Sequence, residues 1–141
     1  MKESEGTEED LLAEVTALLY GDGRHMTGFY GDVQKGEAVA IARCPGKPFC
    51  VVRAWRVIDV EVGREYAQTL AAAGLAPVIL LAEDVVIHSA NKREKGDWVR
   101  TTFQRTFTEG FLFETKNTLY VLAGDGLRLS GTARAVLAMR G

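Results

Sequence analysis

Two apolar stretches, residues 50–62 (CVVRAWRVIDVEV) and residues 77–88 (PVILLAEDVVIH), decide the expected fold of this chain. Both are rich in valine and isoleucine, which favour β-strands. In the first stretch the even-numbered positions are mostly apolar and the odd-numbered positions are mixed, which is typical of a strand with one well-buried face. Residues 63–74, between the two predicted strands, have the spacing of a helix. The strands therefore pair either in an antiparallel manner or as a right-handed parallel crossover, and the sequence leaves both arrangements open.

The N-terminal part is expected to contain one helix followed by a loop. Thr7 and the three acidic residues after it suit a helix start, and apolar residues follow at helical spacing, which predicts a helix over residues 7–20. Five glycines between residues 21 and 36 indicate a loop. Residues 37–43 are predicted to form a strand, and two prolines and a glycine predict a turn over residues 44–48.

The C-terminal half is expected to be rich in strands. A polar loop over residues 89–97 precedes a predicted strand over residues 98–107 (WVRTTFQRTF). Residues 111–115 and 118–122 form a predicted hairpin in which Lys116 and Asn117 make the turn, since asparagine tolerates positive φ. Phe113 then faces Tyr120 across the hairpin. Residues 124–126 are expected to be a loop, and Ser130 is expected to cap a last helix over residues 132–139.

Together these elements predict an α+β fold with a largely antiparallel β-sheet, an N-terminal helix, one mid-chain helix and a short C-terminal helix. The length of 141 residues suits a single domain over residues 1–141, of which residues 1–6 are expected to be flexible. The chain is 47% apolar and 26% charged, values that exclude global disorder. No apolar run reaches the ~18–20 residues that cross a bilayer, and the acidic N-terminus does not resemble a signal peptide. The expected location is therefore a bacterial cytoplasm.

Charge is distributed unevenly along the chain. Residues 1–14 carry a net charge of −5, and the remainder carries +3. A body this weakly basic suits a small anionic ligand and lacks the dense positive field of a dedicated nucleic-acid-binding protein. An amphipathic N-terminal helix, an alanine-rich C-terminal helix and exposed strand edges also predict a homo-oligomer.

The sequence contains no recognisable motif for catalysis or metal binding. Cys44 and Cys50 are too far apart for a usual zinc ligand pair, and with His25 or His88 they would make an uncommon site, so free thiols are the preferred interpretation. A phosphate-binding loop, a nucleophile elbow and a zinc-protease motif are all missing from the sequence. We therefore expect neither enzymatic activity nor a metal or other cofactor.

Two arginines in the predicted strand over residues 98–107 are candidate ligand contacts. Arg100 and Arg105 lie among apolar residues, where an unpaired charge is costly. An arginine next to an aromatic side chain fits a phosphate beside a stacked base. The structural alternative is an arginine on a solvated face or paired to Glu114.

Residues 96–122 also carry a resemblance to known proteins. The segments GDWVRTT (residues 96–102) and FETKNTLYVL (residues 113–122) are similar to a signature of small phage and prophage proteins. A fuller similarity, over residues 50–122, is to an uncharacterised family of pseudomonad and phage proteins. A weaker resemblance is to the first Thoeris anti-defence family, oligomeric phage proteins that sequester cyclic ADP-ribose signals without catalysis. That resemblance implies ligand contacts at Arg100 and Asn117, with Arg105 and Phe107 placed near them.

The sequence therefore predicts a phage or prophage counter-defence protein that binds a small nucleotide-type signal and sequesters it. Its predicted ligand-binding residues are Arg100, Arg105, Phe107 and Asn117. One alternative is an inhibitor or adaptor that binds a host protein, with the acidic residues 1–14 as its recognition feature. Another is an enzyme without a recognisable motif.

Overall fold

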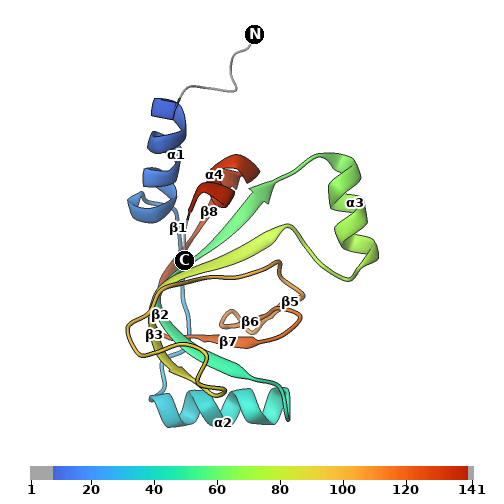
Figure 1. The fold of residues 1–141 in the computed structure, drawn as a ribbon. Coiled ribbons are helices and arrows are strands. Elements are labelled where there is room, and N and C mark those ends of the chain that lie inside the picture. The colour runs from blue at the N-terminus through green and yellow to red at the C-terminus, as the bar shows by residue number, and fades with distance from the viewer. Residues whose placement is uncertain (1–7, 140–141) are drawn as a thin grey trace.

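The computed structural model describes residues 8–139, which form four helices and eight strands (Figure 1). In chain order the elements are α1 (Glu8–Tyr20), β1 (Arg24–Met26), α2 (Val33–Arg43), β2 (Phe49–Glu61), α3 (Arg64–Ala72), β3 (Val78–His88), β4 (Val99–Arg100), β5 (Thr106–Thr108), β6 (Leu112–Glu114), β7 (Leu119–Leu122), β8 (Gly126–Thr132) and α4 (Ala133–Ala138). The strands make one curled, mixed sheet in which antiparallel pairs predominate. The predicted α+β class is confirmed, with α2 as an additional helix.

Strand β2 lies at the centre of the sheet and has neighbours along both edges. Along one edge it pairs with β3 in an antiparallel manner, from Cys50 opposite His88 to Asp59 opposite Val78. The two long strands are therefore an antiparallel pair, and α3 lies in the connection between them. Along its other edge β2 runs parallel to β7 in its first part and parallel to β8 in its second part.

The change of partner along β2 occurs at Ala54 and Trp55. Ala54 has a φ of +52°, in the left-handed region that side chains rarely adopt, and this residue separates the part of β2 that faces β7 from the part that faces β8. Trp55 is buried, and its indole N–H donates a 3.1 Å hydrogen bond to the carbonyl of Gly124, in the loop that joins β7 to β8. Gly126 lies against the ring, since a Cβ there would be 2.3 Å from Trp55 Cδ2.

The segment between β4 and β5 closes the curl of the sheet. The prediction of one continuous strand over residues 98–107 is wrong: the chain pairs with β3 as β4 and with β6 as β5. In between, the N–H groups of Thr101 and Gln104 donate to carbonyls of β3, and the N–H of Arg105 donates to the carbonyl of Glu114 on β6. The segment bends because its backbone groups find partners on two separate strands. The curled sheet encloses an apolar core that includes Val52, Trp55, Leu80, Phe113 and Leu122.

Three of the four helices, α1, α2 and α4, lie against the outside of this sheet (Figure 1). α1 and α4 pack over an apolar cluster that includes Ile58, Ile79 and Leu81. α2 covers a second cluster, around Val51 and Val121, at the opposite end of the molecule. α3 stands apart from the other three helices. Within residues 8–139, no helix is long and apolar enough to cross a membrane.

The strand predicted over residues 37–43 is wrong, because these residues belong to α2. This helix begins after Asp32, whose carboxylate accepts the Lys35 N–H at 2.8 Å and caps the first turn. Gly36 and Ala40 are one turn apart and form its buried side. A prediction that starts at residue 37 leaves out Asp32 and the first turn of α2, and these residues carry the sequence pattern of a helix start.

The C-terminal region also differs from its prediction. β8 runs through Ser130, so the predicted cap at this residue is wrong, and Thr132 caps α4 by accepting the Ala135 N–H at 3.1 Å. Neither β8 nor β1 is among the predicted strands. At the other end, α1 agrees with the helix predicted over residues 7–20, whereas the cap predicted at Thr7 and the flexibility predicted for residues 1–6 lie outside the described residues.

Replacement of Gly126 by alanine is expected to destabilise the fold by about 3 kcal/mol, at the upper end of the cost of overpacking. The added methyl group would overlap both the ring and the carbonyl oxygen of Trp55. Chemical denaturation followed by circular dichroism measures the loss. Gly63→Ala is the matched control, because Gly63 has a φ of −67° and open space around its Cβ position, and its effect should stay within about 0.5 kcal/mol. Equal stabilities of the two variants would contradict this account of Trp55.

Candidate functional site

A cavity of about 600 Å³ lies where the chain leaves two parallel strands. β2 and β8 run side by side and end together, with Glu61 opposite Thr132. The chain then enters α3 after β2 and α4 after β8, and both helices contribute to the cavity walls. Ligands commonly bind at the carboxyl ends of parallel strands whose connections diverge. The volume also falls within the range of roughly 300–1,000 Å³ that is typical of ligand pockets.

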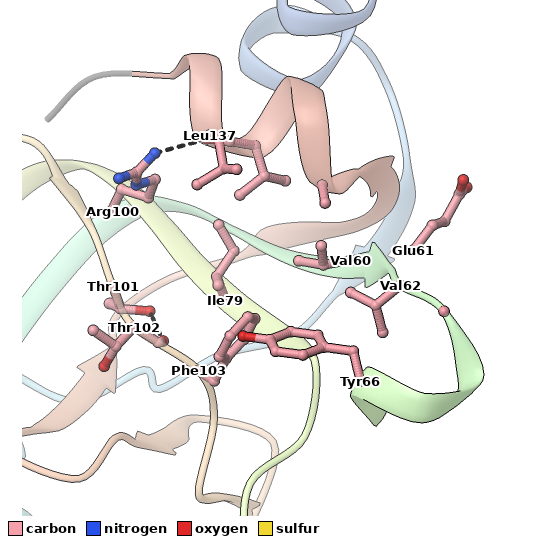
Figure 2. A pocket seen from close by; sticks show the side chains of 13 residues that line it. Val60, Glu61, Val62, Tyr66, Ile79, Arg100, Thr101, Thr102, Phe103 and Leu137 are labelled. Atoms are coloured by element: carbon pink, nitrogen blue, oxygen red, sulfur yellow. Dashed lines mark hydrogen bonds between the residues drawn. The ribbon is translucent and has the colours of Figure 1, made fainter. Parts of the chain in front are cut away.

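The walls of this cavity are mostly apolar (Figure 2). Their apolar side chains come from the end of β2, from β3, from the segment after β4 and from α4, and include Val60, Val62, Ile79, Phe103, Val136 and Leu137. The Tyr66 side chain extends from α3 toward Phe103, and the two ring centroids are 6.2 Å apart in an edge-to-face arrangement. Tyr66 is 49% exposed, so this aromatic pair is accessible from outside.

Arg100 is the one predicted ligand-binding residue among the residues that line the cavity. Its Nη1 donates hydrogen bonds of 2.7 Å to the carbonyl oxygens of Val136 and Met139, at the end of α4. An arginine at a helix C-terminus satisfies carbonyl groups that have no partner within the helix. Within residues 8–139, the charge of Arg100 is therefore accommodated by backbone acceptors, and neither Glu114 nor another carboxylate pairs with it.

Arg56 makes the same kind of contact for α1. Arg56, Leu81 and Arg100 lie opposite one another in the register of β2, β3 and β4, so they form one row on one face of the sheet. Arg56 Nη1 donates to the carbonyl of Gly21 at 2.6 Å and to that of Leu18 at 3.3 Å, at the end of α1. The two arginines thus anchor the C-terminal ends of two neighbouring helices to the sheet, but only Arg100 lines the cavity.

The two threonines after Arg100 differ in their roles. The Thr101 hydroxyl is buried, accepts the Leu80 N–H at 2.9 Å and donates to the Thr102 carbonyl at 2.7 Å. Its hydrogen-bonding capacity is used mainly within the fold. Thr102 is exposed and also lines the cavity, so its hydroxyl is the more accessible of the two.

The other three predicted ligand-binding residues lie outside the cavity. Phe107 packs against Phe113, with ring centroids 6.0 Å apart. Arg105 is exposed and lies close enough to Glu114 to influence the charge of its carboxyl group. Asn117 is exposed at the tip of the β6–β7 hairpin. The structure therefore places these residues around β5, β6 and β7 and does not bring them together with Arg100 at one cavity.

The hairpin turn has the predicted two-residue length but not the predicted backbone. Phe113 faces Tyr120 as predicted, and Thr115 faces Thr118. Asn117 is not among the described non-glycine residues with positive φ, so that part of the prediction is wrong. The turn is closed by the Thr115 N–H, which donates to the Thr118 carbonyl at 2.9 Å, and by the Thr115 hydroxyl, which accepts the Thr118 N–H at 3.2 Å.

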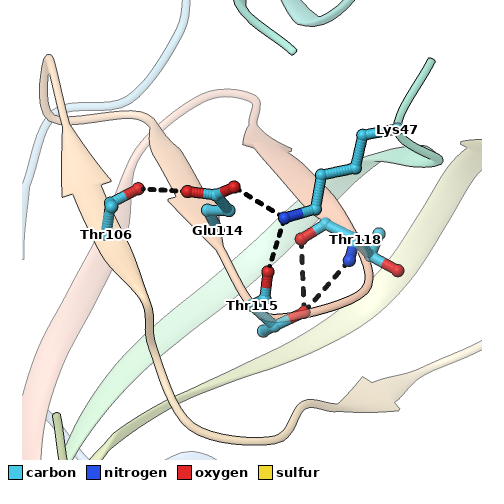
Figure 3. Close-up of polar contacts among 5 residues, drawn as sticks. All are labelled: Lys47, Thr106, Glu114, Thr115 and Thr118. Carbon is cyan, nitrogen blue, oxygen red and sulfur yellow. Dashed lines mark hydrogen bonds and ion pairs between the residues drawn. The ribbon is translucent and has the colours of Figure 1, made fainter. Parts of the chain in front are cut away.

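A partly buried ion pair fixes this hairpin to the chain before β2 (Figure 3). Lys47 Nζ lies 2.6 Å from Glu114 Oε2 and donates a second hydrogen bond, of 2.8 Å, to the carbonyl of Thr115. The Thr106 hydroxyl donates to Glu114 Oε1 at 2.9 Å. Burial alone would raise the pKa of Glu114, but the hydrogen bonds from Lys47 and Thr106, with the charges of Lys47 and Arg105, outweigh burial and lower the pKa. This arrangement stabilises the hairpin.

Cys50 and His88 are buried neighbours in the sheet, and the Cys50 thiol is not activated. Cys50 lies between His88 and Tyr120 in the register of β3, β2 and β7 and is fully buried. Burial raises the pKa of the Cys50 thiol to about 12, so it is protonated at neutral pH. Burial and then the charges of Arg93 and Lys92 lower the pKa of His88. In the described part of the chain, no three His, Cys, Asp or Glu side chains are grouped as metal ligands.

The aromatic part of the cavity, Tyr66 and Phe103, is not among the predicted ligand-binding residues. Tyr66 lies on α3, the helix predicted over residues 63–74, of which only Leu70 is buried. Tyr66 and Phe103 are far apart in the sequence, and no local pattern indicates that their rings meet. One feature of the sequence could have indicated this site. Tyr66 is a large aromatic residue on a short helix that has few other apolar residues to pack against its ring.

Replacement of Lys47 by methionine is expected to cost about 1–3 kcal/mol of unfolding free energy, because the Glu114 carboxylate loses its charged partner. Lys116→Met, at the exposed hairpin tip, is the matched control and should be nearly neutral.

The lowered pKa of Glu114 also makes the fold sensitive to acid. The contribution of the Glu114 carboxylate to the unfolding free energy is complete above the unfolded-state pKa of about 4.3 and is lost as the pH falls through the lower folded-state pKa. Denaturation at pH 7 and pH 3 should show a smaller difference for Glu114→Gln than for the parent, and an unchanged difference would refute this assignment.

Comparison with known proteins gives a family without an assigned activity. Neither a curated protein nor a solved structure matches this chain. A family model, described as a domain of unknown function (DUF6957), matches residues 27–138, which include every element from α2 to α4 and the whole cavity. An uncharacterised family is what the sequence led us to expect. Because the match covers most of its length, the chain belongs to the DUF6957 family.

Proposed function

We propose that this protein binds a small ligand in the cavity between α3 and α4 and holds it without changing its bonds. The observation that carries the proposal is the cavity itself, at the joint end of β2 and β8, with a volume of about 600 Å³ and apolar walls. An apolar pocket of this size with a few polar groups is the usual form of a small-molecule site.

The walls favour a ligand with a flat ring or another apolar body. The Tyr66 and Phe103 rings offer aromatic surface, and Ile79 lies on the sheet beside them (Figure 2). A ring packed against these side chains would bury apolar surface on both partners and gain aromatic contacts. Tyr66, which is half exposed, would lose further contact with water when the ligand binds.

The lining supports binding more than catalysis. Its polar side chains are those of Glu61, Tyr66, Arg100, Thr101 and Thr102, and no histidine, cysteine or aspartate is among the described residues that line it. Nucleophilic catalysis usually needs a nucleophile beside a base that activates it. The lining provides no such pair, which is the support for a non-enzymatic protein.

Sequestration of a signal molecule would give this binding a biological role. Arg100, Thr101 and Thr102, from the segment that resembles phage anti-defence proteins, all line the cavity, so a nucleotide-type signal is the first class to test. Arg100 is the one cationic side chain among the described lining residues, and it suits a ligand with one phosphate better than a polyphosphate. A phage or prophage counter-defence protein would act in this way in the cytoplasm of its bacterial host.

Replacement of Tyr66 by alanine is expected to weaken binding about fivefold, because the ligand loses one aromatic contact. Calorimetric titration with AMP and with the fluorescent sulfonate 1-anilinonaphthalene-8-sulfonate measures the affinity, and mass spectrometry should recover the AMP intact. Tyr30→Ala is the matched control, since Tyr30 is 69% exposed and lies outside this cavity. If neither probe binds, or if only Tyr30→Ala weakens binding, the proposed site is wrong.

A second candidate function, binding to a protein partner, is favoured by the outer side of α1. Leu12 and Tyr20 lie two turns apart on this helix and are 67% and 73% exposed. The helix also begins with exposed acidic residues and precedes the residues that the family model matches. The partner is either a host protein or a second copy of this chain.

If the partner is a second copy, light scattering should show a mass above that of the monomer. Leu12→Ser should then lower the measured mass toward that of the monomer.

A further inference from the structure

We propose that the cavity takes a monocarboxylate with an apolar body, and that the Nε–Nη2 edge of Arg100 holds the carboxylate. This inference rests on the proposed function and names the chemical class of its ligand. It departs from the nucleotide-type ligand that the sequence resemblance implies. Three observations carry it: the unused edge of Arg100, the way another arginine of this chain binds a carboxylate, and the composition of the cavity walls.

One edge of the Arg100 guanidinium makes no hydrogen bond to residues 8–139. Both hydrogen bonds to α4 come from Nη1, which donates to the carbonyls of Val136 and Met139. Nη1 carries two hydrogens, so its capacity is filled. Within the part of the chain that the structure describes, Nε and Nη2 have no hydrogen-bond partner. The contacts to α4 also hold the guanidinium in place, so little side-chain entropy would be lost when an anion binds.

Arg128 demonstrates in the same chain what this edge binds. Its Nε donates to Asp59 Oδ2 at 2.8 Å and its Nη2 donates to Asp59 Oδ1 at 2.7 Å. Two parallel hydrogen bonds of this kind match the geometry of a carboxylate. Arg100 lines the cavity, and no aspartate or glutamate of the described chain forms an ion pair with it.

The surroundings of Arg100 favour a single negative charge. Its guanidinium lies at the end of α4, where carbonyl oxygens are concentrated and would repel further anionic groups. The one carboxylate of the lining belongs to Glu61, and it would also oppose a second charge. A ligand with several phosphates would therefore meet one cation and several repulsive groups.

The remaining walls favour an apolar body over a nucleobase. Recognition of a base edge usually requires amide, hydroxyl or backbone groups that match its donors and acceptors. The described lining contains no asparagine or glutamine, and most of its side chains are aliphatic or aromatic. An alkyl chain or an aryl ring would pack against these aliphatic and aromatic side chains without the matched donors and acceptors that a nucleobase requires.

The test compares each acid with its neutral amide: octanoate with octanamide, and indole-3-acetate with indole-3-acetamide, by calorimetry at pH 7. We expect each acid to bind at least tenfold more tightly than its amide, as the loss of a charge-assisted contact implies. Arg100→Lys keeps the charge but not the two-donor edge, and it should remove most of that preference. Arg56→Lys is the matched control, because Arg56 anchors α1 in the same way but does not line the cavity, and it should leave the preference unchanged.

The outcomes separate this inference from the proposed function. Equal affinity of acid and amide would overturn the carboxylate class while the cavity remained a binding site. Tighter binding of AMP than of either acid would overturn it in favour of a nucleotide. If no acid, amide, AMP or anilinonaphthalene sulfonate binds, the proposed function fails and this inference fails with it. Should Arg100→Lys not fold, the acid-to-amide ratio of the parent protein still decides, since a ratio below about threefold refutes the role of Arg100.

Discussion

The hydrogen bond from the Trp55 indole N–H to the Gly124 carbonyl lies at the point where β2 changes its partner from β7 to β8. This bond fixes the loop between β7 and β8 against the kink of β2 at Ala54. As a result β7 and then β8 pair with β2 along the same edge of that strand. Because β8 then runs parallel to the second part of β2, the two strands end together. α3 and α4 start from that common end, and the cavity between them is a consequence of this topology.

The arginines illustrate how a structural role and a binding role can share one side chain. A buried or half-buried guanidinium requires acceptors, and helix C-termini supply carbonyl groups that lack partners. Arg56 and Arg100 each use this solution from the same row of the sheet. Five N–H groups on each guanidinium exceed what two carbonyls can accept. At Arg100 the surplus lies next to an apolar cavity, and there a fixed, half-satisfied cation is suited to an incoming anion.

Local patterns of the sequence were sufficient to predict the long strands, but they were insufficient to predict the residues of the candidate site. Residues 50–62 and 77–88 are apolar enough to form strands in any arrangement, and β2 and β3 follow them closely. β8 carries glycines at 126 and 131, which weaken a strand signal but are required because Trp55 and Leu18 pack directly on them. Arg100 finds its acceptors on α4, and no local rule links residues so far apart. The cavity is likewise built from four separate segments, so its aromatic pair was not predictable from spacing.

The two segments singled out in the sequence, residues 96–102 and residues 113–122, have different roles in the structure. In the hairpin half, Glu114, Thr115 and Thr118 are occupied by the Lys47 pair and by the closure of the turn, so their residue types are explained by stability alone. Asn117 remains exposed at the tip, where no other described residue makes a contact that requires its amide. In the other half, Arg100 and Thr102 face a cavity and keep polar groups that the fold does not use. An argument for a ligand therefore has to rest on Arg100 and the cavity walls and not on the hairpin.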